Sequence, residues 1–221
     1  MKWVPTAALL LLGCAPALRP TAPPPAEERD PAASLAAIQA IARRTETDHD
    51  AGTRGALVAA AIDEGRRCEA RAPGHPECEY GLALALGLQA RERPSTAADG
   101  LKRMIERLRR AQAAAAGLDS GGPSRVLALV LLRAPGWPLG PGDPEAALAE
   151  ARKAVALFPD YPPNQLALAE AFLATGAEQA GHVAARHALD RARQLEAEGN
   201  SQAPQWIAEA QRLIASAAEA R

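Results

Sequence analysis

Apolar positions in this chain recur at intervals of three and four residues over most of its length. Runs such as "ALVAAAIDEGRRCEA" and "PEAALAEARKAVALF" place alanine and leucine on one face, which is typical of amphipathic helices. Prolines stand near the expected helix starts and glycines near the ends. No run alternates with a period of two, so strands are not expected. The pattern predicts helices over 31–46, 53–71, 77–92, 97–116, 123–134, 144–158, 162–175, 178–197 and 203–220.

Three of these helices carry small residues at a shared spacing of four and then three. Such residues lie on one helix face and let a neighbouring helix approach closely. In the first two helices the set is followed by a proline, which stops the helix. The second and third sets are 34 residues apart. The residues are Ala61, Gly65 and Cys68 with Pro73; Ala147, Ala151 and Ala154 with Pro159; and Gly181, Ala185 and Ala188.

This arrangement resembles the tetratricopeptide repeat, whose unit is a helix, a turn and a second helix with a period of 34 residues. Such helix pairs cannot bury their apolar faces alone, so they stack into a solenoid. The resemblance implies an all-α, tetratricopeptide-like solenoid of helical hairpins, which we place at residues 31–221. The first helices of the pairs would line its concave surface.

The N-terminus has the pattern of an export signal. Lys2 precedes the apolar run "AALLLLG", which is too short to span a bilayer stably, and the run ends in "LLGC" at residues 11–14. This end resembles a bacterial lipobox, in which the cysteine is acylated and becomes the new N-terminus. We therefore expect a signal peptide at 1–13, lipidation of Cys14 and a proline-rich linker at 14–30. An ordinary secretory peptide is the alternative.

A lipobox implies a protein of the bacterial cell envelope that is lipid-anchored and faces the periplasm. Ala15 follows the cysteine in place of an aspartate, which by the lipoprotein sorting rule favours the outer membrane. Contact with the membrane is expected through the lipid anchor only. The formal net charge of −1 predicts no nucleic-acid partner.

Export changes the interpretation of the other two cysteines, because disulfides persist outside the cytoplasm. Cys68 and Cys78 lie late in one predicted helix and early in the next, so we predict that they are bonded to each other. The alternative is a pair of buried thiols. The spacing around His75 matches no strong metal motif, and the chain contains no nucleophile elbow or P-loop. We expect no enzyme, no cofactor and no metal site.

A stiff loop interrupts the helices in "RAPGWPLGPGDPEAA", residues 133–147. The stretch 117–176 around it pairs "GPSR" at 122–125 with "PGWP" at 135–138 and then Gly142-Asp143. These motifs resemble the T-component lipoproteins associated with TRAP transporters. That resemblance, over roughly residues 50–200, implies an adaptor that docks a periplasmic solute-binding protein or handles an apolar small ligand. It also allows a homo-oligomer. The alternative function is a general scaffold for envelope assembly, with other envelope proteins as its partners.

Within the repeat, four side chains are predicted to point into the concave groove as partner-binding residues: Tyr80, Leu84, Leu166 and Glu170. Ordinary core packing is the alternative for the two leucines. Trp137, at the centre of the loop, is a candidate binding anchor, because tryptophan is enriched at interface hot spots; alternatively it folds back onto its own loop. Arg125 stands at a helix start, where a positive charge is unfavourable, which predicts a partner in Asp119 or Asp143.

Overall fold

In the computed structural model, residues 30–93 and 97–219 are described, and within these ranges the chain forms nine α-helices and no β-strand. The all-α prediction is confirmed, and each predicted boundary lies within two residues of the observed one. The predicted signal peptide (1–13), Cys14 and nearly all of the predicted linker (14–30) lie outside the described residues. The helices are α1 (Pro31–Thr47), α2 (Ala51–Arg71), α3 (Pro76–Glu92), α4 (Ala97–Ala114), α5 (Gly122–Arg133), α6 (Pro144–Leu157), α7 (Pro162–Ala174), α8 (Glu178–Ala197) and α9 (Ala203–Glu219).

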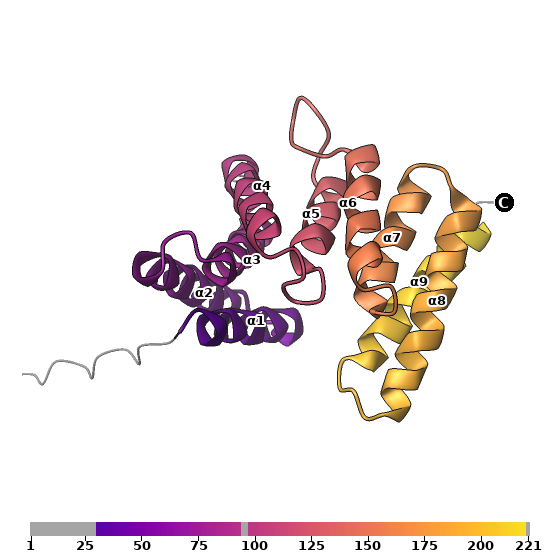
Figure 1. The fold of residues 1–221 in the computed structure, drawn as a ribbon, viewed down its shortest axis with the longest axis horizontal. Coiled ribbons are helices and arrows are strands. Elements are labelled where there is room, and N and C mark those ends of the chain that lie inside the picture. Colours follow the sequence, from indigo (N-terminus) through magenta and orange to yellow (C-terminus); the bar gives the residue numbers. More distant parts are fainter. Residues whose placement is uncertain (1–29, 94–96, 220–221) are drawn as a thin grey trace, which may run out of the picture.

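Consecutive helices pack as antiparallel hairpins, α1 with α2, α3 with α4, α5 with α6 and α7 with α8, and α9 packs on α8 (Figure 1). First helices of neighbouring hairpins also touch: α1 contacts α3, α5 contacts α7 and α7 contacts α9. This succession of hairpins is the tetratricopeptide-like arrangement that the repeat predicted. We call the surface formed by α5, α7 and α9 the first-helix face.

The repeated small residues are the points of closest approach between helices. Ala147, Ala151 and Ala154 of α6 are completely buried. A Cβ atom added at Gly65 of α2 would lie 2.9 Å from the side chain of Leu82 on α3, which no real contact allows. The close packing of neighbouring helices therefore depends on small side chains at these positions, and the core is made mainly of alanine and leucine.

The predicted disulfide is confirmed. Cys68 of α2 is bonded to Cys78 of α3, with the two Cα atoms 5.3 Å apart, and both residues are buried. The bond ties the end of one helix to the start of the next across the short turn that contains Pro73 and His75. Among the described helices, none combines the length and the hydropathy that crossing a bilayer requires.

Candidate interaction surfaces

A buried polar cluster lies where the turn between α4 and α5 meets α3 and α7. Three successive residues of the turn have left-handed backbone conformations: Asp119 (φ 49°), Ser120 (φ 53°) and Gly121 (φ 81°). Left-handed backbone is costly for residues other than glycine and persists where surrounding contacts hold it. Arg125 supplies those contacts, because one terminal nitrogen donates to the carbonyl oxygens of Asp119 and Ser120, each at 3.2 Å. The other donates to Oδ2 of Asp119 at 2.8 Å.

The predicted partner of Arg125 is therefore Asp119, and the alternative is excluded. Asp143 instead caps the start of α6, because its Oδ1 accepts the N–H of Ala146 at 3.0 Å. The cluster continues into α7 through Asn164, whose Oδ1 accepts from Arg125 at 2.9 Å. The amide nitrogen of Asn164 donates to three carbonyl oxygens, those of Ser120, Ala154 and Phe158.

Tyr80 belongs to this cluster and does not line a groove. Its side chain is 1% exposed, and its hydroxyl donates to Oδ2 of Asp119 at 2.7 Å. Burial raises the pKa of the Tyr80 hydroxyl well above its ordinary value, so it acts as a neutral donor. The prediction that Tyr80 is a surface residue of the concave groove was wrong, because α3 turns this side chain toward the α4–α5 turn.

Leu166 is likewise a core residue and not a groove residue. It is 3% exposed and packs in the cluster that contains Trp206 of α9. Trp206 meets Tyr161 edge to face with ring centroids 5.7 Å apart, and Tyr161 in turn lies beneath the guanidinium of Arg125, at 5.1 Å. This aromatic packing leaves Leu166 almost no exposed surface, so the ordinary packing alternative is the correct one. Leu84, the other leucine, is half-buried against the N-terminal core.

Glu170 lies on the first-helix face, and its neighbours there are charged. Its carboxylate accepts a 2.7 Å hydrogen bond from Arg133 of α5. The same guanidinium nitrogen of Arg133 is 3.9 Å from Glu209 of α9. Burial raises the pKa of the Glu209 carboxyl, the carboxylate of Glu170 raises it further, and Arg133 acts in the opposite direction. Helices α5, α7 and α9 thus present a shared charged group on the first-helix face, and Glu170 is the predicted groove residue that belongs to it.

A polar pocket of about 520 Å³ lies between α1 and the turn that joins α8 to α9. Arg43 of α1 forms one side and the α8–α9 turn, from Gly199 to Gln202, forms the other. Its lining is polar, and none of the predicted groove residues contributes to it.

The loop between α5 and α6 holds a defined shape through its own backbone. The N–H of Gly142 donates to the carbonyl of Pro135 at 2.8 Å, and the N–H of Gly140 donates to the carbonyl of Gly136 at 3.1 Å. A Cβ atom at Gly142 would overlap the carbonyl oxygen of Ala134, so the close return of the chain requires glycine there. The loop projects beyond the ends of α5 and α6 in Figure 1.

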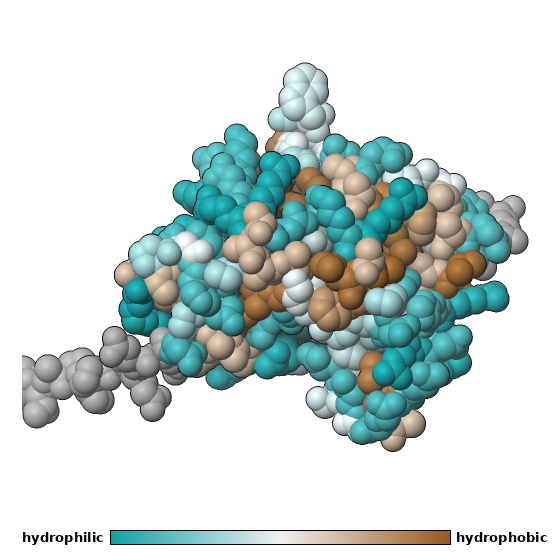
Figure 2. Space-filling view, in the orientation of Figure 1, coloured by the Kyte–Doolittle hydropathy of each residue, from teal (hydrophilic) through white to brown (hydrophobic). Residues whose placement is uncertain are grey.

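Two large apolar side chains stand at the tip of this loop. Trp137 is 89% exposed and Leu139 is 79% exposed. In Figure 2 the tip stands clear of the rest of the surface. The alternative in which Trp137 folds back onto its loop is therefore excluded. An exposed tryptophan beside an exposed leucine, on a loop held by backbone hydrogen bonds, has the features of a binding anchor.

A second apolar surface, which the sequence pattern did not reveal, lies between α7 and α8. This groove has a volume of about 500 Å³. Leu168 and Phe172 of α7 form one side, and Val183, which is 60% exposed, stands on the other. Figure 2 shows apolar side chains gathering over the neighbouring helices α6 and α7. The only sequence signal of this groove is the four-residue spacing of Leu168 and Phe172. The same spacing is found on buried helix faces, so it does not distinguish a groove from the core.

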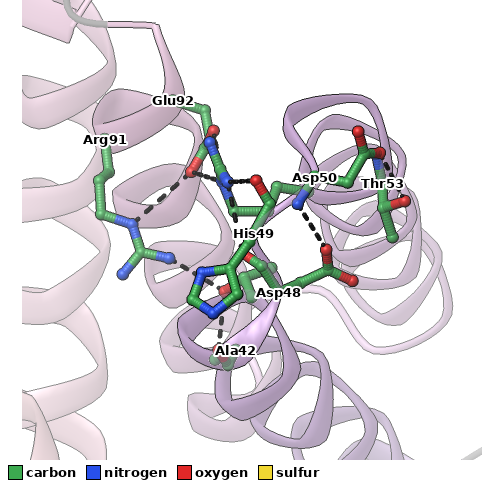
Figure 3. A network of polar contacts seen from close by, with 9 residues as sticks. Ala42, Asp48, His49, Asp50, Thr53, Arg91 and Glu92 are labelled. Carbon is green, nitrogen blue, oxygen red and sulfur yellow. Dashed lines mark hydrogen bonds and ion pairs between the residues drawn. The ribbon is translucent and has the colours of Figure 1, made fainter.

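The turn between α1 and α2 carries a further polar network, shown in Figure 3. Arg54 of α2 pairs with Glu92 of α3, its Nε lying 3.1 Å from Oε1, and also donates to the carbonyl of His49 at 3.1 Å. The N–H and hydroxyl of Thr53 lower the pKa of Asp50, which caps α2. This network joins the α1–α2 turn to the end of α3. Among the described residues, no group of three or more His, Cys, Asp or Glu side chains could hold a metal ion.

Comparisons with known proteins add little to this description. No protein-family model matches the chain, and no curated protein is significantly similar to it. Among solved structures, one described as a MamA RS-1 ArsTM double mutant is similar to it, with 14% sequence identity and a TM-score of 0.48. The match covers 86% of this chain and 98% of that chain. The assignment of a tetratricopeptide-like fold rests on the hairpins described above, and such a fold suggests protein partners in general.

Proposed function

We propose that this protein is a lipid-anchored, periplasm-facing adaptor that binds a solute-binding protein, in the manner of the T-component of TRAP transport systems. The proposal is supported by the "GPSR" and "PGWP" motifs of residues 122–125 and 135–138 and by the lipobox-like "LLGC". The protein acts by presenting surfaces.

The first-helix face is the docking surface in this proposal. The observation that carries it is the group formed by Arg133, Glu170 and Glu209, which joins three helices yet leaves charged atoms partly exposed. Side-chain exposure is 59% for Arg133 and 22% for Glu170. Charged groups at an interface select a partner with complementary charges and speed its association. A folded protein with a complementary charged patch fits such a face better than an apolar small molecule does.

Affinity purification tests this proposal. The tagged full-length chain is recovered from its own envelope extract, with bound proteins identified and bound small molecules extracted for mass spectrometry. We expect one solute-binding protein at near-stoichiometric level. Reversing the charge with Glu170→Lys should abolish its capture, and adding Arg133→Glu to that variant should restore the ion pair within the chain. Trp137→Ala, which changes a different surface, should capture the partner normally.

Other outcomes of the purification contradict the proposal. Recovery of several envelope-assembly proteins without a solute-binding protein would favour the general scaffold. Recovery of an apolar metabolite alone would favour small-ligand handling. The anchor is tested separately: Cys14→Ser should prevent incorporation of labelled fatty acid and release the protein from the membrane fraction. Unchanged labelling in that variant would exclude Cys14 as the acylated residue.

A further inference from the structure

The exposed tip of the α5–α6 loop has no partner within its own chain. Trp137 and Leu139 are the two most exposed large apolar residues of the described part of the protein. Side chains exposed to 89% and 79% make almost no contact with α5, α6 or any other helix. Burial of an indole and an isobutyl group is favourable in proportion to the apolar area removed from water, and the exposed tip forgoes that free energy. The tip therefore has the properties of one half of an interface, for which a second molecule supplies the other half.

The groove between α7 and α8 has the converse properties. Its volume of about 500 Å³ lies in the range of sites that hold ligands much larger than an indole. Leu168, Phe172 and Val183 supply apolar surface, and Ala180 and Ala184 leave space between them because their side chains are small. No side chain of the described residues fills it, and Val183 remains 60% exposed.

Exposed charges of opposite sign stand beside the two surfaces, apart from Arg133 at the base of the loop, which is paired with Glu170, and Glu178 near the groove. Asp143 and Glu145 are exposed at the base of the loop. Arg152 is exposed beside the groove, with its Cζ 5.5 Å from the ring centroid of Phe172. Arg186 is also exposed and follows Val183 by three residues, so it lies on the same side of α8. His187, at the edge of the groove, already faces Asp160 at 3.3 Å.

We propose that Trp137 and Leu139 of one copy of this chain insert into the α7–α8 groove of a second copy. The tip and the groove match in apolar character, and in the inserted arrangement Asp143 and Glu145 beside the loop would lie opposite Arg152 and Arg186 beside the groove. Because these are two different surfaces, the contact is heterologous. Repeated from copy to copy, it forms a ring when the rotation between copies permits closure. When two copies each insert their loop into the other, it forms a dimer. This self-association goes beyond the proposed adaptor function and uses surfaces separate from the first-helix face.

One such contact is small. Tryptophan and leucine side chains together bury far less than the ~800 Å² per partner of a stable protein interface. Association is therefore expected to depend on protein concentration and to be dominated by the tryptophan. Replacing an aromatic hot spot of this kind by alanine weakens binding by roughly thirtyfold or more.

Site-specific cross-linking between two versions of the full chain tests the inference. One version carries Leu139→Cys and the other carries Val183→Cys, and the two are expressed together in cells and treated with a short bismaleimide. We expect a product with the mass of two chains that contains one of each version. Adding Trp137→Ala to the first version should reduce its yield about thirtyfold. Because Trp137 is exposed, this substitution leaves the fold intact, which circular dichroism checks.

Controls distinguish the proposed contact from random collision. The unsubstituted chain measures the background, which should be low because Cys68 and Cys78 are bonded to each other and Cys14 is acylated in the proposed function. Leu157→Cys is the matched control for Val183→Cys, because Leu157 is also an exposed apolar residue but does not line the groove. Equal yields with Val183→Cys and Leu157→Cys would overturn the inference. The inference would also be overturned if the Leu139→Cys chain were cross-linked only to a different protein. This outcome is independent of the purification with Glu170→Lys, which tests the adaptor function.

Discussion

The hydroxyl of Tyr80 donates a 2.7 Å hydrogen bond to the carboxylate of Asp119, a residue held in the left-handed region at φ 49°. The two residues are 39 positions apart, and their contact joins α3 to the turn that starts α5. Arg125 binds the same oxygen of Asp119, so the carboxylate has one charged and one neutral donor. This arrangement stabilises the strained turn and, with it, the position of the third hairpin relative to the second.

Removal of the Tyr80 hydroxyl should weaken this junction without emptying the core. Tyr80→Phe keeps the ring but deprives Asp119 of its neutral donor, so we expect a loss of about 1–2 kcal/mol in the free energy of unfolding. Urea denaturation followed by circular dichroism measures it. Tyr161→Phe is the control, because the structure gives the Tyr161 side chain ring contacts but no such bond to Asp119. An unchanged stability in Tyr80→Phe would show that Arg125 alone holds the turn.

Gly122 should tolerate no side chain, because a Cβ atom there would overlap the Tyr80 hydroxyl and lie 2.8 Å from Oδ2 of Asp119. Tyr80 is buried and cannot move aside. Gly122→Ala should therefore destabilise the protein by about 1–3 kcal/mol or more, as overpacking of cores does. Gly55→Ala is the matched control: it lies inside α2 with open space around the position, so about 0.5–1 kcal/mol of stabilisation is expected. Thermal unfolding of the two variants should move in opposite directions.

Loss of the bond between Cys68 and Cys78 should lower stability by about 2–3 kcal/mol, since it closes a short loop of the unfolded chain. The measurement is the midpoint of urea denaturation with and without a reductant. The Cys68→Ala/Cys78→Ala variant provides the control, because its midpoint should not respond to the reductant. An equal response in this variant would mean that the reductant acts elsewhere.

The stability contribution of Glu209 should depend on pH. Its pKa is raised in the folded protein above the ordinary 4.5, so the folded state holds the proton more tightly than the unfolded state does. Stability therefore falls as pH rises from about 4.5 through the raised pKa, because the carboxylate becomes charged in a partly buried site beside Glu170. The free energy of unfolding of Glu209→Gln minus that of the wild type should therefore be larger at pH 7.5 than at pH 4.5.

Thermal unfolding of both proteins at the two pH values measures this difference. Exposure of the Glu209 side chain screens the effect, so a small shift is expected. Glu170→Gln at the same two pH values is a useful comparison, because it removes the carboxylate that opposes ionisation of Glu209. If Glu209→Gln were instead less stable relative to the wild type at pH 7.5 than at pH 4.5, attraction to Arg133 would outweigh burial, and the pKa of Glu209 would lie below its ordinary value.

The helices and the disulfide could be predicted from the sequence, and the partner of Arg125 could be restricted to Asp119 or Asp143, because each depends on nearby residues. Apolar periodicity, prolines and capping residues act within one or two helical turns. Cys68 and Cys78 lie in adjacent helices, and Arg125 is only six residues from Asp119. At such short separations the chain has few ways to arrange itself, so spacing alone restricts the contacts.

The surfaces required the tertiary structure. Tyr80 and Leu166 were expected in a groove and are core residues, because successive residues of a helix point about 100° apart and a small rotation decides which of them faces solvent. That rotation is set by packing against helices distant in sequence, as in the contacts of Tyr80 with Asp119 and of Leu166 with the Trp206 cluster. The same long-range packing assembles Arg133, Glu170 and Glu209 into one charged group, leaves the α7–α8 groove open and holds Trp137 away from every helix. Local patterning determined which residues are helical and buried on average, while the fit between distant helices decided which side chains a partner can reach.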